Sequence, residues 1–181
     1  MERKTKIDFR TAYLKELEDC WNVIEEARSL MNSKGNNQWT SEYPSKQDIM
    51  EDLNNGNAYV VTIDGKIVVY GAVVLNGEPQ YEFLEGKWLT DGNYYVVHRL
   101  ATLPEFQGKG LAKEFMRHVN SLCQVEDVPS IKIDTHANNR PMIHLLSTLA
   151  YSICGRVNYG KRGMRFAFEK LTMPVSNISQ Q

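Results

Sequence analysis

A glycine-bearing turn between a predicted strand and a predicted helix constrains the fold of this 181-residue chain more than any other feature. The strand is expected over Tyr94 to Leu103, and the turn follows it as Gln107-Gly108-Lys109-Gly110. A helix is predicted next, because apolar side chains recur at three- and four-residue spacing: Leu111, Ala112, Phe115, Met116, Val119, Leu122 and Cys123. A strand that leads through glycines into a helix indicates an α/β fold, and the first-turn amides of such a helix can bind an anion.

The segments before this turn predict a short strand, then two helices, then two strands. A short strand is expected over Ile7 to Arg10, followed by a long amphipathic helix that ends near Gly35. Ser45 and Asp48 form a capping-box pattern, which predicts the start of a second helix. β-Branched residues then flank Asp64-Gly65, a dipeptide typical of a tight turn between two antiparallel strands.

The segments after the turn alternate between strand and helix patterns. Ile131 to Thr135 is a predicted buried strand, and Asn138 or Asn139 can cap a further helix. Strands are expected at Tyr151 to Asn158 and at Met164 to Leu171. The whole order predicts a mixed α/β arrangement in which an antiparallel half precedes a βαβ half.

We expect one domain over residues 1–171. No element is predicted for residues 76–93. Residues 172–181 are rich in Ser, Asn and Gln and are expected to form a disordered tail, because they cannot bury enough apolar surface to be ordered alone.

Charge, hydropathy and cysteine usage exclude several classes of function. Lys and Arg total 21 against 22 Asp and Glu, so no basic face is expected to bind nucleic acid or an anionic membrane. The charged N-terminal residues lack the apolar stretch of a secretory signal, and the longest apolar run, Ile67 to Leu75, is too short to span a bilayer. Cys20, Cys123 and Cys154 are odd in number and widely spaced, so neither a disulfide frame nor a metal site is expected. These features favour a cytoplasmic protein without a nucleic-acid, membrane or metal partner.

Three interpretations of the glycine turn compete, and the spacing separates them. A Walker loop needs G-x-x-x-x-G-K-[ST], and no such string occurs in the sequence. A dinucleotide fingerprint needs G-x-G-x-x-G, but Lys113 stands where the third glycine would be. A plain strand-to-helix turn without a ligand is the remaining alternative.

The segment Gln107-Gly108-Lys109-Gly110-Leu111-Ala112 resembles the Q/R-x-x-G-x-G/A motif of the GCN5-related N-acetyltransferases, the GNAT family. The resemblance extends to the preceding strand, His98-Arg99-Leu100-Ala101-Thr102-Leu103, and to the order of elements from about Ile7 to Leu171. It implies a GNAT-like acyl-CoA N-acyltransferase fold, with a mixed, mostly antiparallel sheet and helices on both faces. It also implies transfer of an acetyl group from acetyl-CoA to a primary amine in a direct ternary complex, by a monomer or a homodimer.

The same resemblance implies which residues bind coenzyme A. Backbone amides of the loop and helix start would hold its pyrophosphate: Gln107, Gly108, Lys109, Gly110, Leu111 and Ala112, with Lys113 nearby. The pantetheine would pair with main-chain groups of Leu100, Ala101 and Thr102, much as an added strand does. Asn139 resembles the asparagine that contacts the cofactor in the family, and a simple helix cap is the alternative for this residue.

Transfer to an amine requires a base, because an alkylammonium with a pKa of about 10 is almost fully protonated at neutral pH. His98 is the favoured base, since it lies near the position where related enzymes carry a glutamate and imidazole titrates near neutrality. Tyr95, Asp134 and His136 are the second choices. A backbone N–H near Ala101 would stabilise the negative charge that develops on the carbonyl oxygen.

The helix after Asn139 departs from the family pattern. Related enzymes often carry a tyrosine seven residues after the asparagine, as general acid to the sulfur, and that position is Leu146 in this sequence. The departure favours an alternative function, a non-catalytic acyl-CoA-binding module with the same fold. An unrelated interaction domain with a coincidental loop is a third alternative.

The acceptor is expected to be a small-molecule or peptide amine. Trp39 and Tyr43 in a predicted loop, and Asp134 at the end of a strand, are the candidate acceptor-binding residues. Glu51 and Asp52 on the second helix supply further carboxylates that, with the aromatic rings, would attract a cation. Plain packing of the rings and solvation of the acids are the alternatives.

Overall fold

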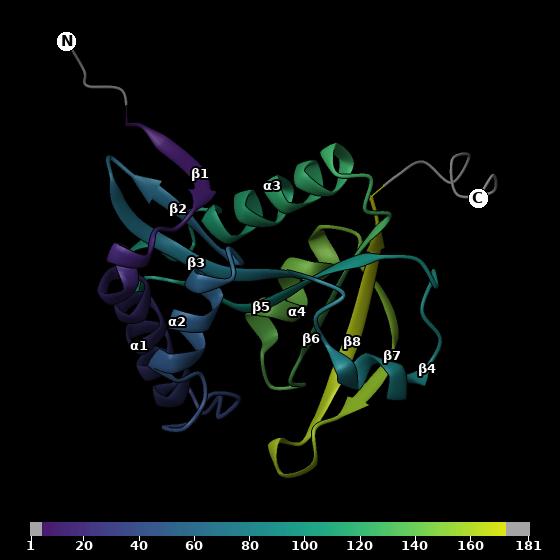
Figure 1. Ribbon diagram of the computed structural model, residues 1–181. Helices are drawn as coiled ribbons and strands as arrows, with labels where there is room; N and C mark the ends of the chain where they lie inside the picture. Colours follow the sequence, from purple (N-terminus) through teal and green to yellow (C-terminus); the bar gives the residue numbers. More distant parts are fainter. Residues whose placement is uncertain (1–4, 173–181) are drawn as a thin grey trace. The chain divides into compact units, whose positions relative to one another are not determined.

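The computed structural model describes residues 5–172, which divide into two compact units (Figure 1). Unit 1 contains the described residues up to Val73 together with His98–His118. Unit 2 contains Val74–Val97 together with the described residues from Val119 onward. The chain passes between the units at three places: inside strand β3 (Lys66–Leu75), inside strand β5 (Tyr94–Thr102) and inside helix α3 (Leu111–Val125). The predicted cofactor loop therefore lies wholly in unit 1.

Unit 1 begins with the strand and the two helices that the apolar spacing predicted. Its first elements are β1 (Ile7–Thr11), a 3₁₀ turn (Leu14–Glu16), α1 (Leu17–Ser33) and α2 (Lys46–Asn54). The predicted capping box is present, because the Asp48 N–H donates to Ser45 Oγ at 3.2 Å and the Ser45 N–H donates to Asp48 Oδ2 at 2.6 Å. Both backbone donors would otherwise lack a partner at the helix start, so Ser45 fixes where α2 begins.

The strands of unit 1 form the predicted hairpin. β2 (Ala58–Ile63) pairs antiparallel with β3 (Lys66–Leu75) on one side and with β1 on the other. Asp64 and Gly65 in the turn have φ angles of 49° and 88°. Both angles lie in the left-handed region that Asp and Gly tolerate better than other residues, which is why this dipeptide predicts the turn.

Unit 1 carries helices on both faces of its strands. Gly71 in β3 faces α3, because a Cβ at this position would lie 2.6 Å from the Phe115 ring. The neighbouring Tyr70 points to the opposite face, where its hydroxyl donates to Asp52 of α2. Phe9 of β1 also packs against Phe115, with the ring centroids 5.3 Å apart. The close approach of α3 to β3 thus requires a residue without a side chain at position 71.

Unit 2 is built around the last two strands, which Figure 1 shows as the yellow end of the described chain. β7 (Ser152–Asn158) pairs antiparallel with β8 (Met164–Leu171). β6 (Ser130–Thr135) pairs antiparallel with β8 and parallel with the start of β5. Helix α4 (Arg140–Thr148) follows β6. All four elements were predicted: β8 has the predicted bounds, and β6 and β7 differ from theirs by one residue at the start.

Residues 76–93, for which no element was predicted, contain a 3₁₀ turn (Pro79–Phe83) and the two-residue strand β4 (Glu85–Gly86). We call this segment connection 76–93. β4 pairs with β7 at Gly155, and a Cβ on Gly86 would lie 2.1 Å from the Cys154 carbonyl oxygen. A strand of two residues has no alternation to reveal it, so the sequence pattern gave no signal for β4.

Across the sheet, in which neighbouring strands are hydrogen-bonded, the eight strands follow the order β1-β2-β3-β5-β6-β8-β7-β4. The pairings β1–β2, β2–β3, β6–β8, β7–β8 and β4–β7 are antiparallel, whereas β5–β6 is parallel. The predicted mixed, mostly antiparallel α/β fold with helices on both faces is confirmed. Within the described part of the chain, every helix falls short of the length and apolar character needed to cross a bilayer.

Thr172, the first residue of the expected tail, is ordered. Thr172 is buried, its N–H donates to the Pro129 carbonyl at 2.9 Å, and its hydroxyl donates to the Val128 carbonyl at 2.6 Å. Residues 173–181, the rest of the expected tail, lie outside the described residues.

Candidate functional site

Strand β5 is distorted at Arg99, whose φ of 56° lies in the left-handed region. A non-glycine residue takes such a φ inside a strand only at a strain of about 1–3 kcal/mol. The distortion interrupts the regular alternation of side chains between the two faces of the strand, just before Leu100, Ala101 and Thr102. The predicted pantetheine-binding segment therefore begins at an irregularity in the strand, which the sequence pattern did not predict.

The Arg99 side chain holds a buried cluster together, which we call the Asp52 cluster: Asp52, Tyr70, Arg99 and Tyr43. Arg99 Nε–H and Nη2–H donate to the two oxygens of Asp52 at 3.0 and 2.6 Å, and Nη1–H donates to the Tyr43 hydroxyl at 3.2 Å. The Tyr70 hydroxyl donates to Asp52 Oδ2 at 2.5 Å. Burial and the nearby Asp52 carboxylate raise the pKa of Tyr70, so this hydroxyl stays protonated and donates. The cluster joins α2, β3, β5 and the loop before α2.

The glycine loop has the backbone geometry that an anion-binding turn needs. Gly108 and Gly110 have φ angles of 74° and 77°, and a Cβ at either position would meet no atom within 4 Å. Glycine is therefore needed here for its conformation and not for lack of space. The Gly110 carbonyl accepts the Glu114 N–H at 3.0 Å, so Gly110 is the residue from which α3 starts. The amides of Leu111 and Ala112 then belong to the first turn, where a helix offers no internal acceptor.

The surroundings of the loop carry positive charge. Lys109 Nζ lies 4.7 Å from the centroid of the Phe106 ring, and Lys66 Nζ lies 5.3 Å from the same centroid. Lys66 also forms an exposed ion pair with Glu105 at 2.6 Å. Lys113, the other predicted lysine, is half-buried on the first turn of α3. Lysine charges and the helix dipole act in the same direction, because both favour an anion at the loop.

His98, the favoured base, is half-buried on β5 and directly precedes the distorted Arg99. Ala101 is buried, whereas Leu100 and Thr102 are half-buried. His98 and the predicted cofactor-binding residues 100–102 and 107–113 all belong to unit 1. The structure thus places the favoured base and the cofactor loop in one compact unit.

The second choices for the base, Tyr95, His136 and Asp134, all lie in unit 2, and Asp134 is described below. Tyr95 is buried, and its hydroxyl donates to the Glu126 carboxylate. His136 Nδ1 accepts the Asn138 N–H at 3.2 Å. Both side chains therefore already take part in hydrogen bonds within unit 2.

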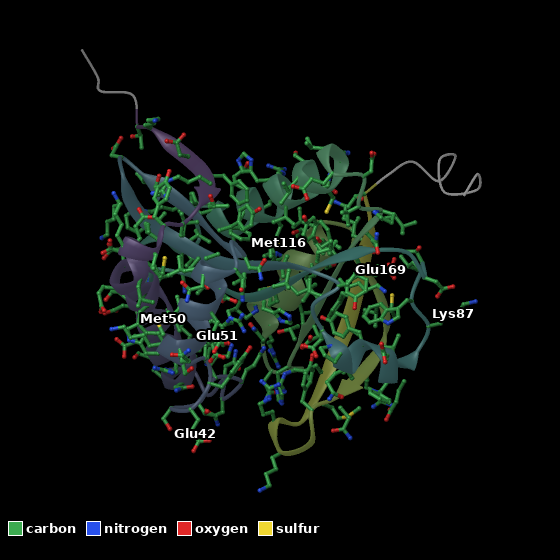
Figure 2. All side chains as sticks on the ribbon, in the orientation of Figure 1. Glu42, Met50, Glu51, Lys87, Met116 and Glu169 are labelled. Carbon is green, nitrogen blue, oxygen red and sulfur yellow. The ribbon has the colours of Figure 1, made fainter. Side chains whose placement is uncertain are left out.

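The aromatic residues of the loop before α2 have different surroundings. Trp39 is only 5% exposed, which fits the packing alternative. Tyr43 is half-buried and binds Arg99 through its hydroxyl. Glu42 lies in this loop and Glu51 on α2 (Figure 2), and both are exposed. Asp52, the next residue of α2, is buried. On α2, Asp52 thus forms an ion pair with Arg99, whereas Glu51 is exposed to solvent.

Asp134 at the end of β6 forms a second cluster, which we call the Asp134 cluster: Asp134, Tyr81, Tyr159 and Glu78. The hydroxyls of Tyr81 and Tyr159 both donate to Asp134 Oδ2, at 2.8 and 2.9 Å. Burial raises the pKa of Asp134; the two hydroxyls oppose this rise, and the negative charge of Glu78 adds to it. Burial, Asp134 and Glu78 together raise the pKa of Tyr159, so it remains a donor. Nothing in the sequence pattern linked Tyr81 or Tyr159 to this carboxylate.

Asn139 and Leu146 both belong to α4 and its cap. Asn139 Oδ1 accepts the Met142 N–H at 3.4 Å, so the residue is the N-cap of α4, as its alternative interpretation predicted. Leu146 is fully buried in unit 2. The position where related enzymes carry a general acid is thus a core position here. Among residues 5–172, no group of three or more His, Cys, Asp or Glu side chains is arranged to hold a metal ion.

The chain belongs to the GNAT acetyltransferases. The sequence model of the Acetyltransferase (GNAT) family matches residues 16–151, which is more than half of the chain. A comparison with curated protein sequences gave no match.

Solved structures agree with this assignment. A GNAT-family acetyltransferase from Streptococcus agalactiae 2603 is 35% identical, with a TM-score of 0.84 over 93% of this chain and 96% of that chain. A putative acetyltransferase from Staphylococcus aureus Mu50 is 23% identical, with a TM-score of 0.69 over 91% of this chain and 99% of that chain. The PaiA N-acetyltransferase from Thermoplasma acidophilum, solved in complex with coenzyme A, is 13% identical, with a TM-score of 0.66 over 92% and 99% of the two chains. The predicted family is confirmed, and the last two structures share the fold.

Proposed function

We propose that this chain transfers the acetyl group of acetyl-CoA to a primary amine of a small molecule or a peptide, with donor and acceptor bound at the same time. The observation that carries the proposal is the loop from Gln107 to Ala112, where two glycines in the left-handed conformation lead directly into α3. Membership of an acetyltransferase family supports the reaction class. The neighbour solved with coenzyme A supports the nature of the donor.

The residues of the loop fit the donor. Amides of the first turn of α3 and the charges of Lys109 and Lys113 suit a diphosphate, and the open space around Gly108 and Gly110 lets phosphate oxygens approach the backbone. Acetyl-CoA, when bound, supplies an activated thioester carbonyl. The chain contributes main-chain groups of residues 100–102 that would hold the pantetheine, and an N–H near Ala101 that would stabilise negative charge on the carbonyl oxygen. His98 would accept the proton that the amine must lose.

The first experiment measures the affinity for acetyl-CoA by calorimetry. Gly110→Glu adds a carboxylate at the phosphate site, and we expect the affinity to fall at least about 100-fold, or ~2.7 kcal/mol. Gly35→Glu is the matched control, because Gly35 has the same φ of 77° and no atom within 4 Å of its Cβ position. Both variants carry the same backbone strain and charge, so equal affinities in the two would show that the loop does not bind the diphosphate.

The second experiment measures release of the coenzyme A thiol with polyamines, amino acids, aminoglycosides and peptides as acceptors. Release with at least one amine is the expected result. His98→Ala should lower the rate and remove the acidic limb of its pH profile, whereas an unchanged rate and limb would eliminate His98 as the base.

A non-catalytic acyl-CoA-binding module is the second candidate, and the buried Leu146 favours it. Both candidates bind acetyl-CoA, and the thiol assay separates them. Binding without release for every amine would support the module.

A further inference from the structure

Arg99 combines a strained backbone with a buried and fixed side chain. Its φ of 56° is left-handed within β5, and a non-glycine residue keeps such a conformation only where its surroundings hold it there. The guanidinium donates to both oxygens of Asp52, at 3.0 and 2.6 Å, and to the Tyr43 hydroxyl, at 3.2 Å. The side chains of Arg99 and Asp52 are only 12% and 7% exposed. The strained backbone and the buried ion pair thus occur at the same residue.

Asp52 is a rigid partner for this arginine. It lies on the same face of α2 as the buried Ile49 and Leu53, which pack the helix into unit 1. From β3, the Tyr70 hydroxyl donates to Asp52 Oδ2 at 2.5 Å. A carboxylate that is held from two sides fixes the plane of a guanidinium that bonds to both of its oxygens. The position of the Arg99 side chain is therefore set by α2 and β3.

The residues that follow Arg99 are those that the proposed function assigns to the donor. Residues 100–102 come directly after it, and the backbone beyond them is paired to β3, because the Leu103 N–H donates to the Val68 carbonyl at 2.9 Å. A left-handed residue turns the peptide groups that follow it, so the direction of the N–H and C=O groups of residues 100–102 depends on the backbone of Arg99. An extended ligand pairs with a strand only through groups that point towards it. All of these residues belong to unit 1.

Stability alone is a poor reason for this arrangement. A buried ion pair loses much of its attraction to desolvation, so apolar side chains of similar volume often stabilise a core as well or better. The left-handed backbone adds strain to the folded state. An arginine–carboxylate pair supplies a fixed direction, because its two parallel hydrogen bonds allow one relative orientation. The pair is therefore suited to holding a strained backbone in one conformation.

We propose that Asp52 and Arg99 are positioning residues for the donor: their ion pair holds the left-handed backbone at Arg99 and thereby directs the main-chain groups of residues 100–102 towards the pantetheine of coenzyme A. The proposal rests on the donor site of the proposed function and deepens it. Two parts of that site then depend on different features of the chain. The glycine loop binds the diphosphate without the ion pair, whereas the pantetheine requires the pair.

The first test compares the affinities of two ligands by calorimetry: coenzyme A, and 3′-phosphoadenosine 5′-diphosphate, which is coenzyme A without its pantetheine. Asp52→Asn should weaken binding of coenzyme A at least tenfold and change the affinity for the nucleotide by less than twofold. Glu16→Gln is the matched control, because it likewise removes the charge of a carboxylate that pairs with an arginine of unit 1, Arg10, at 2.8 Å. Neither affinity should change in this control.

The difference between the two ligands separates positioning from stability. A general loss of stability would weaken both ligands alike, so a purely structural role for Asp52 produces no such difference. The proposal is overturned if the coenzyme A affinity of Asp52→Asn lies within twofold of that of Glu16→Gln, or if both ligands lose affinity equally.

The second test isolates the backbone conformation at position 99. Asp52→Asn/Arg99→Gly and Asp52→Asn/Arg99→Ala both lack the ion pair and leave no unpaired buried carboxylate, so they differ only in one methyl group. Glycine adopts a φ of 56° without strain, whereas alanine does not. The alanine variant should therefore bind coenzyme A at least fivefold more weakly than the glycine variant, with equal affinities for the nucleotide. Equal coenzyme A affinities would show that the backbone of Arg99 does not direct the pantetheine.

Failure of this proposal can be told apart from failure of the proposed function. If the wild type binds both ligands and the variants change both affinities equally, the positioning role is rejected and the donor site stands. If the wild type binds neither ligand, the donor site is rejected, and the positioning role with it. If coenzyme A binding depends on the ion pair but no amine releases the thiol, the positioning role is supported and the transfer is rejected.

Discussion

The two units each contain a carboxylate bonded to tyrosine hydroxyls, and the two differ in what balances its charge. Asp52 in unit 1 receives the Tyr70 hydroxyl together with a two-point contact from Arg99. Asp134 in unit 2 receives two tyrosine hydroxyls, and its pKa is raised by burial. A guanidinium supplies a full charge and fixed donors, whereas hydroxyls supply donors alone.

This difference changes how each carboxylate contributes to the stability of its unit. The charge of Asp52 is already matched inside the protein, so the cluster ties α2 to β5 and has no need of a ligand. At Asp134, burial raises the pKa of the carboxyl group, and the two hydroxyls and the charge of Arg165 oppose that rise.

The largest expected effect follows from removing the guanidinium of the Asp52 cluster. Arg99→Met leaves a buried carboxylate without a cation, and the free energy of unfolding should fall by about 3–5 kcal/mol. Urea denaturation measures the change. Arg10→Met is the control, because Arg10 pairs with Glu16 at 2.8 Å nearer the surface and should lose less than about 1 kcal/mol. Equal losses would mean that Asp52 does not depend on Arg99.

A smaller effect is expected from the tyrosine of the same cluster. Tyr70→Phe removes one hydroxyl from a buried carboxylate and should lower the free energy of unfolding by about 1–3 kcal/mol. Tyr94→Phe, in which no hydrogen bond to a carboxylate is lost, should stay within about 0.5 kcal/mol of the wild type. If the two variants were equally stable in urea, the Tyr70 hydroxyl would contribute nothing to the cluster.

The smallest effect concerns the pH dependence of stability at Asp134. The folded pKa of Asp134 is raised above its unfolded value of about 3.9, so the folded state binds more protons between these two values. The free energy of unfolding therefore decreases as the pH rises through this window. Asp134→Asn removes the decrease, and this variant should be more stable than the wild type above the window. Urea denaturation at a series of pH values measures the slope, and an increase of wild-type stability across the window would contradict the assignment.

The sequence predicted the elements that depend on local periodicity or on local hydrogen bonds. The apolar spacing of α3, the Ser45–Asp48 capping box and the Asp64-Gly65 turn are properties of neighbouring residues, and the structure contains all three. The glycine loop was identified for the same reason, because its chemistry lies in consecutive amides.

The clusters could not be predicted, because their members come together only through tertiary contacts. Arg99 binds a carboxylate 47 positions earlier, and Tyr81 binds one 53 positions later. The sequence did indicate a special role for Arg99, since this charged residue interrupts a mostly apolar strand. It gave no such indication for Tyr81, because a tyrosine in a segment without a predicted element is as often a packing residue.

The open space around Gly108 and Gly110 shows that these positions require a residue that tolerates a left-handed φ, and not a residue with a small side chain. A mirror-image alanine introduced by protein semisynthesis would occupy the same φ without strain, whereas ordinary alanine would not. Such a D-residue would also narrow the conformations of the unfolded chain, and would therefore stiffen the turn ahead of α3 while leaving its amides in place.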